Sequence, residues 1–135
     1  MDSALGDDAN AGTALDQPWK SLGKVNAFAF QAGDTILFKA NSSYAGQLEP
    51  TRSGTAASPI RFGMYGEGSK PIIDGAGYLA ALHIRNLKNV EFSNLTLTSD
   101  AGTPIDAGAL DERDGVLVES TTGTSSHIYL QNLDI

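Results

Sequence analysis

Three acidic side chains and one arginine follow one another directly in the C-terminal part of the sequence. They are Asp111, Glu112, Arg113 and Asp114. Carboxylate oxygens are the ligands that Ca²⁺ prefers, and a guanidinium can neutralise a negatively charged group of a substrate. The run therefore has two interpretations. It is either a solvated loop with an internal ion pair, or a site in which Asp111, Glu112 and Asp114 hold calcium and Arg113 binds substrate.

A second group of oxygen ligands lies near the N-terminus, at Asp7, Asp8 and Asn10. Calcium requires several oxygens that converge on one point. This stretch lacks both the spacing of an EF-hand loop and the glutamate that closes one. A solvated coil is therefore favoured over a calcium loop.

The two histidines, His83 and His127, are the obvious candidates for proton transfer. His83 stands between apolar neighbours in an expected strand, so its side chain should alternate away from them and face solvent. His127 opens another expected strand and is interpreted as a surface residue. Neither forms part of a recognisable catalytic motif, so the catalytic residues stay unassigned.

Composition limits the classes of function. The formal net charge of −7 argues against a nucleic-acid surface, which needs clustered Lys and Arg. There is no cysteine, which excludes disulfides and thiolate sites. The sequence has no apolar run of about 18 residues, so no membrane span is expected. Its acidity favours a secreted protein, either extracellular or periplasmic.

The elements that would position these side chains are short. One domain is expected over residues 1–135, and it begins with a coil over 1–16. A helix is expected over 17–29, with Asp16 as its N-cap and Pro18 in its first turn. Apolar residues recur at every third position of that helix, which predicts packing against a core: Trp19, Leu22 and Val25.

Residues 34–135 have the pattern of short strands separated by turns. No helical pattern separates these strands, so βαβ units are excluded. The strands are also too short and too closely spaced for ordinary hairpins. They are expected within 35–39, 59–65, 71–75, 82–84, 90–92, 95–97 and 127–130.

A weak internal repeat explains this spacing. Residues 90–97 and 128–135 match in their apolar positions and in one asparagine, Asn94 or Asn132. Asparagine tolerates the left-handed backbone conformation of a sharp bend, and its amide can bond to the same residue of the next turn. We therefore expect Asn94 and Asn132 to stack, with the apolar residues around them pointing inward.

Several motifs resemble those of a known superfamily: Gly12-Thr13, Pro18-Trp19-Lys20-Ser21-Leu22, Gly33-Asp34-Thr35-Ile36-Leu37-Phe38-Lys39, Pro59-Ile60-Arg61-Phe62-Gly63-Met64-Tyr65-Gly66 and Lys70-Pro71-Ile72-Ile73-Asp74-Gly75. The chain resembles the opening of proteins of the pectate-lyase-like superfamily, which includes alginate lyases, chondroitinase-B-like lyases and several glycoside hydrolases. The resemblance implies an all-β fold, a right-handed single-stranded parallel β-helix (a solenoid). It also implies that residues 17–29 cap the solenoid and that the chain is its N-terminal part.

Turns of this superfamily are about two dozen residues long, and the longer offset between Asn94 and Asn132 implies an insertion. Residues 99–114 have no strand pattern and are expected to form that loop. Such loops wall the substrate groove in the resembled enzymes, which is the setting expected for residues 111–114.

The resemblance implies part of a secreted carbohydrate-active enzyme with a polysaccharide as its substrate. We expect a polysaccharide lyase that cleaves an acidic glycan by β-elimination, with Ca²⁺ as a candidate cofactor. A glycoside hydrolase on the same fold, and a non-catalytic adhesin or glycan-binding surface protein, stay open as alternatives. The chain by itself is expected to be inactive and to self-associate through an open C-terminal turn.

Overall fold

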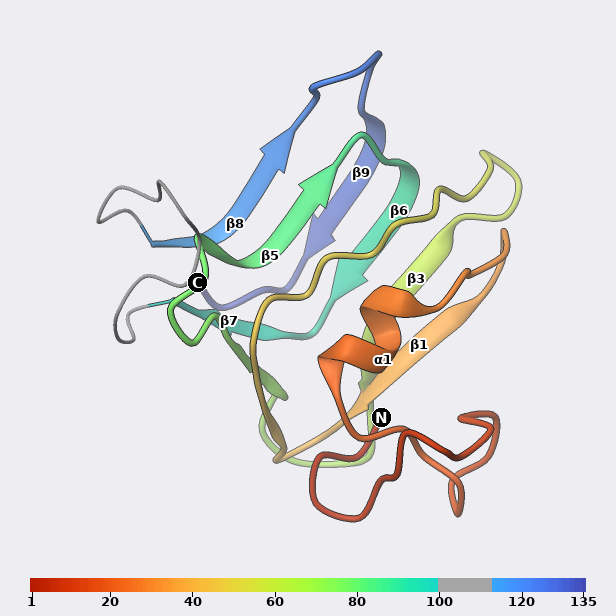
Figure 1. The fold of residues 1–135 in the computed structure, drawn as a ribbon, viewed down its shortest axis with the longest axis vertical. Coiled ribbons are helices and arrows are strands. Elements are labelled where there is room, and N and C mark those ends of the chain that lie inside the picture. Colours follow the sequence, from red (N-terminus) through yellow and green to blue (C-terminus); the bar gives the residue numbers. More distant parts are fainter. Residues whose placement is uncertain (100–112) are drawn as a thin grey trace.

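The fold is described from a computed structural model, which describes residues 1–99 and 113–135. These residues form one helix and nine strands (Figure 1). The helix is α1 (Leu22–Ala27), and the strands are β1 (Thr35–Lys39), β2 (Ser43–Ala45), β3 (Ile60–Tyr65), β4 (Ile72–Asp74), β5 (Ala80–Arg85), β6 (Lys88–Ser93), β7 (Thr96–Thr98), β8 (Asp114–Glu119) and β9 (Ser126–Gln131). The predicted all-β class is confirmed.

The strands form three sheets. Sheet A has the order β1-β3-β6-β9, sheet B has β2-β4-β7, and sheet C has β5-β8. Every strand pair in the described part of the chain is parallel. The chain passes from sheet A to B to C and back to A, so each sheet gains one strand per turn. Figure 1 shows α1 and the N-terminal coil at the β1 end of sheet A, with β9 at the other end and β8 beside β5 in sheet C.

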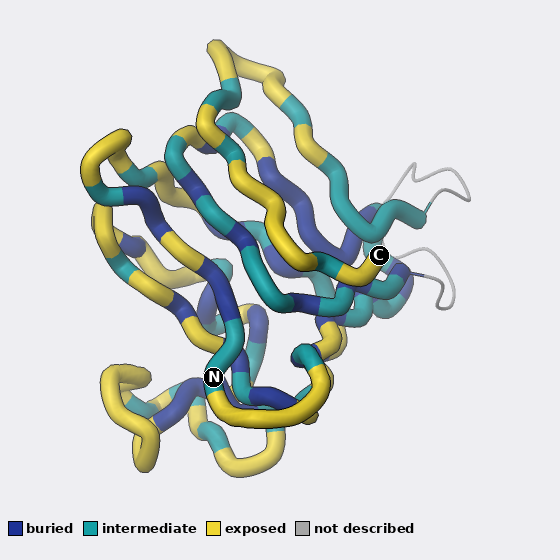
Figure 2. The backbone as a smooth tube through the Cα atoms, turned by 180° about the vertical axis from the view of Figure 1, so that it is seen from behind, coloured by how far each residue is buried: buried dark blue, intermediate teal, exposed yellow. Residues whose placement is uncertain are grey.

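Alternation of side chains explains how each strand packs. In β1, Ile36 and Phe38 are buried, whereas Thr35 and Leu37 are exposed. The register places Phe62 beside Ile36 and Phe92 beside Phe62, so inward positions of successive turns stack on one another. The rings of Phe62 and Phe92 lie 4.7 Å apart at an interplanar angle of 10°. Burial decreases toward β9 (Figure 2).

The predicted asparagine stack is confirmed. Asn94 has a φ of 57° and Asn132 a φ of 52°, both in the left-handed region. The Asn132 Nδ2–H donates to Asn94 Oδ1 at 2.6 Å. The two bends therefore occupy equivalent places in successive turns, with their side-chain amides joined.

The helix is shorter than the predicted span 17–29. It begins after Ser21, whose Oγ accepts from the Lys24 N–H at 3.2 Å, so the prediction of Asp16 as N-cap is wrong. The helix does not begin earlier because the carbonyls of Pro18 and Trp19 accept hydrogen bonds from the N–H groups of Asp7 and Asp2. The N-terminal coil thus takes the hydrogen bonds that an earlier helical turn would need.

The apolar residues predicted for the helix are buried in the core. Trp19 is 8% exposed, Leu22 4% and Val25 0%. Trp19 lies just before α1 rather than inside it, and its indole Nε1–H donates to the Asn10 carbonyl at 2.8 Å. The predicted core role of Trp19 is confirmed.

The N-terminal coil is fixed by its aspartates. Asp8 accepts from the backbone N–H groups of Lys20 and Ser21 and from the Ser21 hydroxyl. Burial raises the pKa of Asp8, but these hydrogen bonds outweigh it and bring the pKa below its usual value. Asp8 therefore holds the coil against the start of α1, which gives it a structural role without calcium.

Among the described residues, no helix is long and apolar enough to cross a membrane.

Candidate functional site

The acidic run singled out in the sequence is only partly described by the structure. Asp111 and Glu112 lie outside the described residues. Arg113 is partly buried directly before β8, and Asp114 is the first residue of β8, where its N–H donates to the Leu79 carbonyl at 2.8 Å. Within 1–99 and 113–135, no three His, Asp or Glu side chains are grouped to hold a metal ion. Calcium binding by Asp111, Glu112 and Asp114, and substrate binding by Arg113, stay predictions.

The structure brings four other polar side chains together on the outer face of sheet C: Glu49, His83, Arg85 and Glu119. We call this group the sheet C cluster. His83 Nε2 lies 2.9 Å from Glu119 Oε1, and His83 Nδ1 lies 3.8 Å from Glu49 Oε1. Arg85 Nε donates to Glu49 Oε1 at 3.1 Å and lies 3.7 Å from Glu119 Oε1. A second nitrogen of Arg85, Nη2, also contacts Glu49.

Three successive turns contribute to the sheet C cluster. His83 and Arg85 are two residues apart in β5, so they share one face of the sheet. Arg85 pairs in register with Glu119 of β8. Glu49 follows Leu48, which forms an isolated parallel bridge with Leu82. The cluster therefore runs across the sheet, perpendicular to the strands.

The prediction that His83 faces solvent is wrong. It points to the outer face as expected, but only 7% of it is exposed. The side chains that cover it on both sides belong to the neighbouring turns. Glu119 lies 36 residues after His83 in the sequence, and Glu49 lies 36 residues before Arg85. A search for oppositely charged residues about one turn apart would have found this cluster.

His127 lies where it was predicted, on the surface. It is exposed, with a φ of 53° near the start of β9. No hydrogen bond or ion pair of its ring occurs among those found in the described residues. The interpretation of His127 as a surface residue is confirmed.

The charged groups of the sheet C cluster suit ligand binding or stabilisation of the sheet better than general acid catalysis. The Glu49 carboxylate raises the pKa of the Arg85 guanidinium, so Arg85 stays charged. A general acid of a glycoside hydrolase has to keep its proton near neutral pH, which apolar surroundings favour and an adjacent cation opposes. Glu49 and Glu119 both lie beside Arg85 and therefore do not have those surroundings.

A polar cleft of about 410 Å³ adjoins the sheet C cluster. Glu49 and Arg85 form part of its wall, and the remaining lining comes from the turns between sheets C and A: Pro50, Thr51, Ser53, Asn86, Leu87 and Thr121. The Asn86 side chain is hydrogen-bonded within the protein, because its Oδ1 accepts from the N–H groups of Thr121 and Thr122. The cleft has carboxylate, guanidinium and hydroxyl groups, which can bond to sugar hydroxyls.

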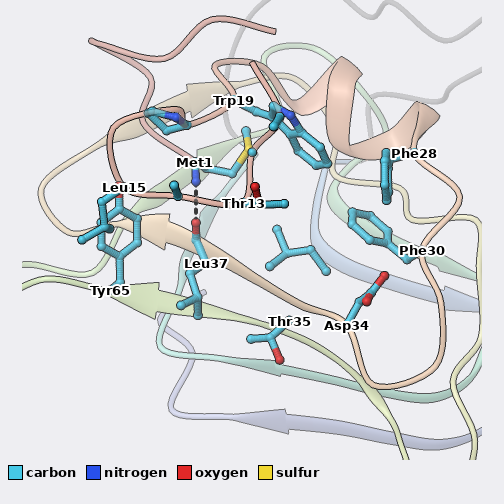
Figure 3. Close-up of a pocket in the computed structure, with 15 residues that line it drawn as sticks. Met1, Thr13, Leu15, Trp19, Phe28, Phe30, Asp34, Thr35, Leu37 and Tyr65 are labelled. Carbon is cyan, nitrogen blue, oxygen red and sulfur yellow. Dashed lines mark hydrogen bonds between the residues drawn. The ribbon is translucent and has the colours of Figure 1, made fainter. Parts of the chain in front are cut away.

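A second pocket, of about 490 Å³, lies between the N-terminal coil and β1 (Figure 3). Its lining is largely apolar and includes three aromatic rings in mutual contact, those of Trp19, Phe28 and Phe30. Phe28 is 40% exposed, and its ring centroid lies 4.9 Å from that of Trp19. Neither this pocket nor the sheet C cluster was predicted from the sequence.

Comparison with known proteins gives a consistent result. No family model matches the chain. A lacto-N-biosidase of Bifidobacterium longum subsp. longum is 41% identical over 83 residues, which are 57% of this chain and 5% of that protein. Crystal structures of the GH136 lacto-N-biosidase of Eubacterium ramulus, as selenomethionine derivative and as native protein, match 98% of this chain at 30% identity. Their TM-scores are 0.87 and 0.86.

The chain therefore spans about a quarter of the length of the solved relatives and about a twentieth of the curated one. The matches are to lacto-N-biosidases, which are glycoside hydrolases, and those of Eubacterium ramulus belong to family GH136, so the expected assignment to the pectate-lyase-like superfamily is wrong. The sequence motifs behind that assignment consist of turn residues and inward apolar residues, which specify how a chain coils and not which bond it cleaves. The comparisons favour the glycoside hydrolase alternative over the polysaccharide lyase.

Proposed function

We propose that this chain is the opening segment of a glycoside hydrolase of the lacto-N-biosidase type. The observation that carries the proposal is the match of 98% of the chain to the Eubacterium ramulus enzyme, at 30% identity and a TM-score of 0.87. Because the chain spans 26% of that enzyme, the activity is proposed for a polypeptide that contains residues 1–135 together with further turns.

The proposal includes a finer description of the fold. The three parallel sheets form successive turns of a right-handed β-helix, with α1 capping its first turn. Support comes from the repeated order of the sheets and from the stacked pair Asn94 and Asn132. In such a coil, one outer face can carry a binding groove along many turns.

Within that enzyme we assign this chain a positioning role. Hydrolysis of a glycosidic bond requires two carboxyl groups placed on either side of it, one as acid and the other as base or nucleophile. The described carboxylates of the sheet C cluster are paired with Arg85 and His83 and do not meet this requirement. We therefore do not propose the sheet C cluster as the catalytic pair.

Two further expectations belong to the proposal. Secretion fits an enzyme whose substrate is a glycan outside the cell, and the net charge of −7 is compatible with it. Self-association of the isolated chain is supported by exposed apolar side chains in its last turn: Val118, Leu130 and Ile135. A strand at the open edge of a sheet, as β9 is, adds unpaired backbone groups to that surface.

The activity is tested with a polypeptide that contains residues 1–135, incubated with an aryl lacto-N-bioside. We expect release of lacto-N-biose and of the aryl alcohol, because a glycoside hydrolase adds water across the glycosidic bond. Residues 1–135 alone serve as the control and should release neither product. The polypeptide should also give no rise in absorbance near 235 nm on alginate, pectate or chondroitin, since that signal reports β-elimination.

Turnover of those acidic glycans with an unsaturated product would show a lyase. Binding of lacto-N-biose without release from the bioside would show a glycan-binding protein. Either outcome would overturn the proposed hydrolase.

A further inference from the structure

The polar cleft beside the sheet C cluster lies where a short connection stands between two longer ones. Residues 86–87 alone join β5 to β6, whereas 46–59 join β2 to β3 and 120–125 join β8 to β9 (Figure 1). Asn86 has a φ of 57°, and this left-handed conformation lets the chain bend within so few residues. The longer connections therefore form two walls, and residues 86–87 form the floor between them.

Hydrogen bonds hold both walls to the floor. On one side, Ser53 Oγ accepts from the Lys88 N–H at 3.0 Å. On the other side, the Asn86 Nδ2–H donates to Thr121 Oγ1 at 2.9 Å, and Asn86 Oδ1 accepts from the Thr121 N–H at 2.8 Å. A ligand therefore meets walls that are already ordered, which reduces the entropy lost on binding.

Glu49 and Arg85 are the charged residues among those found to line this cleft, and their charges compensate each other. The cleft therefore attracts neither an anion nor a cation by net charge. Glu49 Oε1 accepts from Arg85 Nε, whereas no hydrogen bond of Glu49 Oε2 or of the Thr51 hydroxyl was found in the described part of the chain. A neutral ligand with hydroxyl groups, which both donate and accept, matches a carboxylate oxygen beside a guanidinium.

We propose that this cleft binds one neutral sugar ring of a glycan, edge-on, through two adjacent hydroxyl groups. One hydroxyl donates to the Glu49 carboxylate, and its neighbour accepts from the Arg85 guanidinium, with Thr51 beside them at the rim. None of the described lining residues is aromatic, so the ring is held by its edge and not by stacking on its face. The inference rests on the proposed function, because that function supplies the glycan.

The test uses methyl β-galactoside as the probe, since its ring has adjacent hydroxyl groups and carries no charge. The protein is the polypeptide used for the hydrolysis assay, with ¹³C-labelled threonine methyl groups. Thr51→Ser and Thr121→Ser assign the two methyl signals that report on this cleft. We expect both signals to shift saturably, with a Kd of about 1–10 mM, because a single ring makes few contacts.

Glu49→Gln keeps the size of the side chain but removes its charge, which strengthens a bond from a hydroxyl. We expect this variant to raise the Kd about tenfold. The matched control is Glu91→Gln, since Glu91 also pairs with an arginine, Arg61 at 2.7 Å, but lies on sheet A outside the cleft. This control should leave the Kd unchanged.

A second variant tests the cleft without touching the ion pair. Thr51 is exposed at the rim, so Thr51→Trp should fold and fill the cleft from the side. We expect it to abolish the shift of the Thr121 methyl signal, while its Tm stays that of the unchanged protein. Retained binding in Thr51→Trp, or an equal Kd for Glu49→Gln and Glu91→Gln, would overturn the proposal.

Two further measurements separate this proposal from other outcomes. Tighter binding of inorganic phosphate than of the galactoside would show an anion site at Arg85 and would also overturn it. Hydrolysis of the aryl lacto-N-bioside is followed with the same polypeptide. Hydrolysis without methyl shifts would refute sugar binding in the cleft alone, whereas methyl shifts without hydrolysis would support the cleft and refute the proposed hydrolase.

Discussion

Replacement of Phe92 by alanine is expected to lower the free energy of unfolding by about 3–5 kcal/mol. Phe92 is completely buried on β6, and its ring stacks on that of Phe62 at 4.7 Å. Removal of the ring leaves a cavity between turns that the surrounding strands cannot fill, because their backbones are fixed by the ladders on both sides. Urea unfolding followed by circular dichroism measures the change.

The matched control is Tyr129→Ala on β9. Tyr129 is also aromatic and lies on sheet A, but it points outward and is 58% exposed. Its loss should change the free energy of unfolding by less than about 1 kcal/mol. Similar losses for the two variants would mean that Phe92 is not part of a stacked core.

Replacement of Asn94 by valine is expected to lower the free energy of unfolding by about 1.5–3.5 kcal/mol. The variant loses the hydrogen bond from Asn132, worth about 0.5–1.5 kcal/mol. It also places a β-branched residue at a φ of 57°, where steric repulsion adds about 1–2 kcal/mol. The same unfolding measurement applies.

Asn94→Gly separates the two contributions. Glycine adopts the left-handed conformation without strain, so this variant should lose mainly the hydrogen bond and be more stable than Asn94→Val. If the glycine variant is as unstable as the valine variant, the bend does not require the left-handed conformation. If neither variant is destabilised, the stacking of Asn94 on Asn132 does not contribute to stability.

The all-β class and the stacked asparagines could be predicted from the sequence because their signals are local and repeated. Apolar alternation identifies β1, and the match between residues 90–97 and 128–135 locates two equivalent bends. Two strands were missed. β2 is only three residues long, and β8 begins at Asp114, the last residue of the stretch 99–114 expected to form a loop.

Features that depend on neighbouring turns could not be predicted in the same way. The end of α1 at Ser21 depends on N-terminal residues that take the carbonyls of Pro18 and Trp19. Burial of His83 depends on Glu49 and Glu119, each contributed by a different turn. A pattern read along one strand does not contain these lateral contacts.

The sequence alone favoured a lyase, whereas the comparisons favour the glycoside hydrolase alternative, for a related reason. Stacked parallel strands require glycines in their bends and apolar residues at their inward positions. Proteins of this architecture therefore share these residues even when their activities differ. Residues that distinguish a hydrolase from a lyase are the pair of carboxyl groups around the scissile bond. Among the described carboxylates, Asp8 accepts a hydrogen bond from Ser21 and Glu119 is paired with His83.

Parallel stacking of successive turns underlies both the similarity to the lacto-N-biosidases and the assembly of the sheet C cluster. It can be tested directly with cysteine pairs, because the chain has no cysteine of its own. In the parallel register Glu91 lies beside Tyr129, and both point outward from sheet A. Adjacent strands bring Cα atoms close enough for a disulfide.

Glu91→Cys combined with Tyr129→Cys should therefore form an intramolecular disulfide under mild oxidation, detected by mass spectrometry of the monomer after proteolysis. Glu91→Cys combined with Leu130→Cys is the control, since Leu130 pairs with Phe92 and points inward. We predict rapid and nearly complete cross-linking of the first pair and little of the second. No cross-link in the first pair, or preferential cross-linking of the second, would contradict the parallel coil.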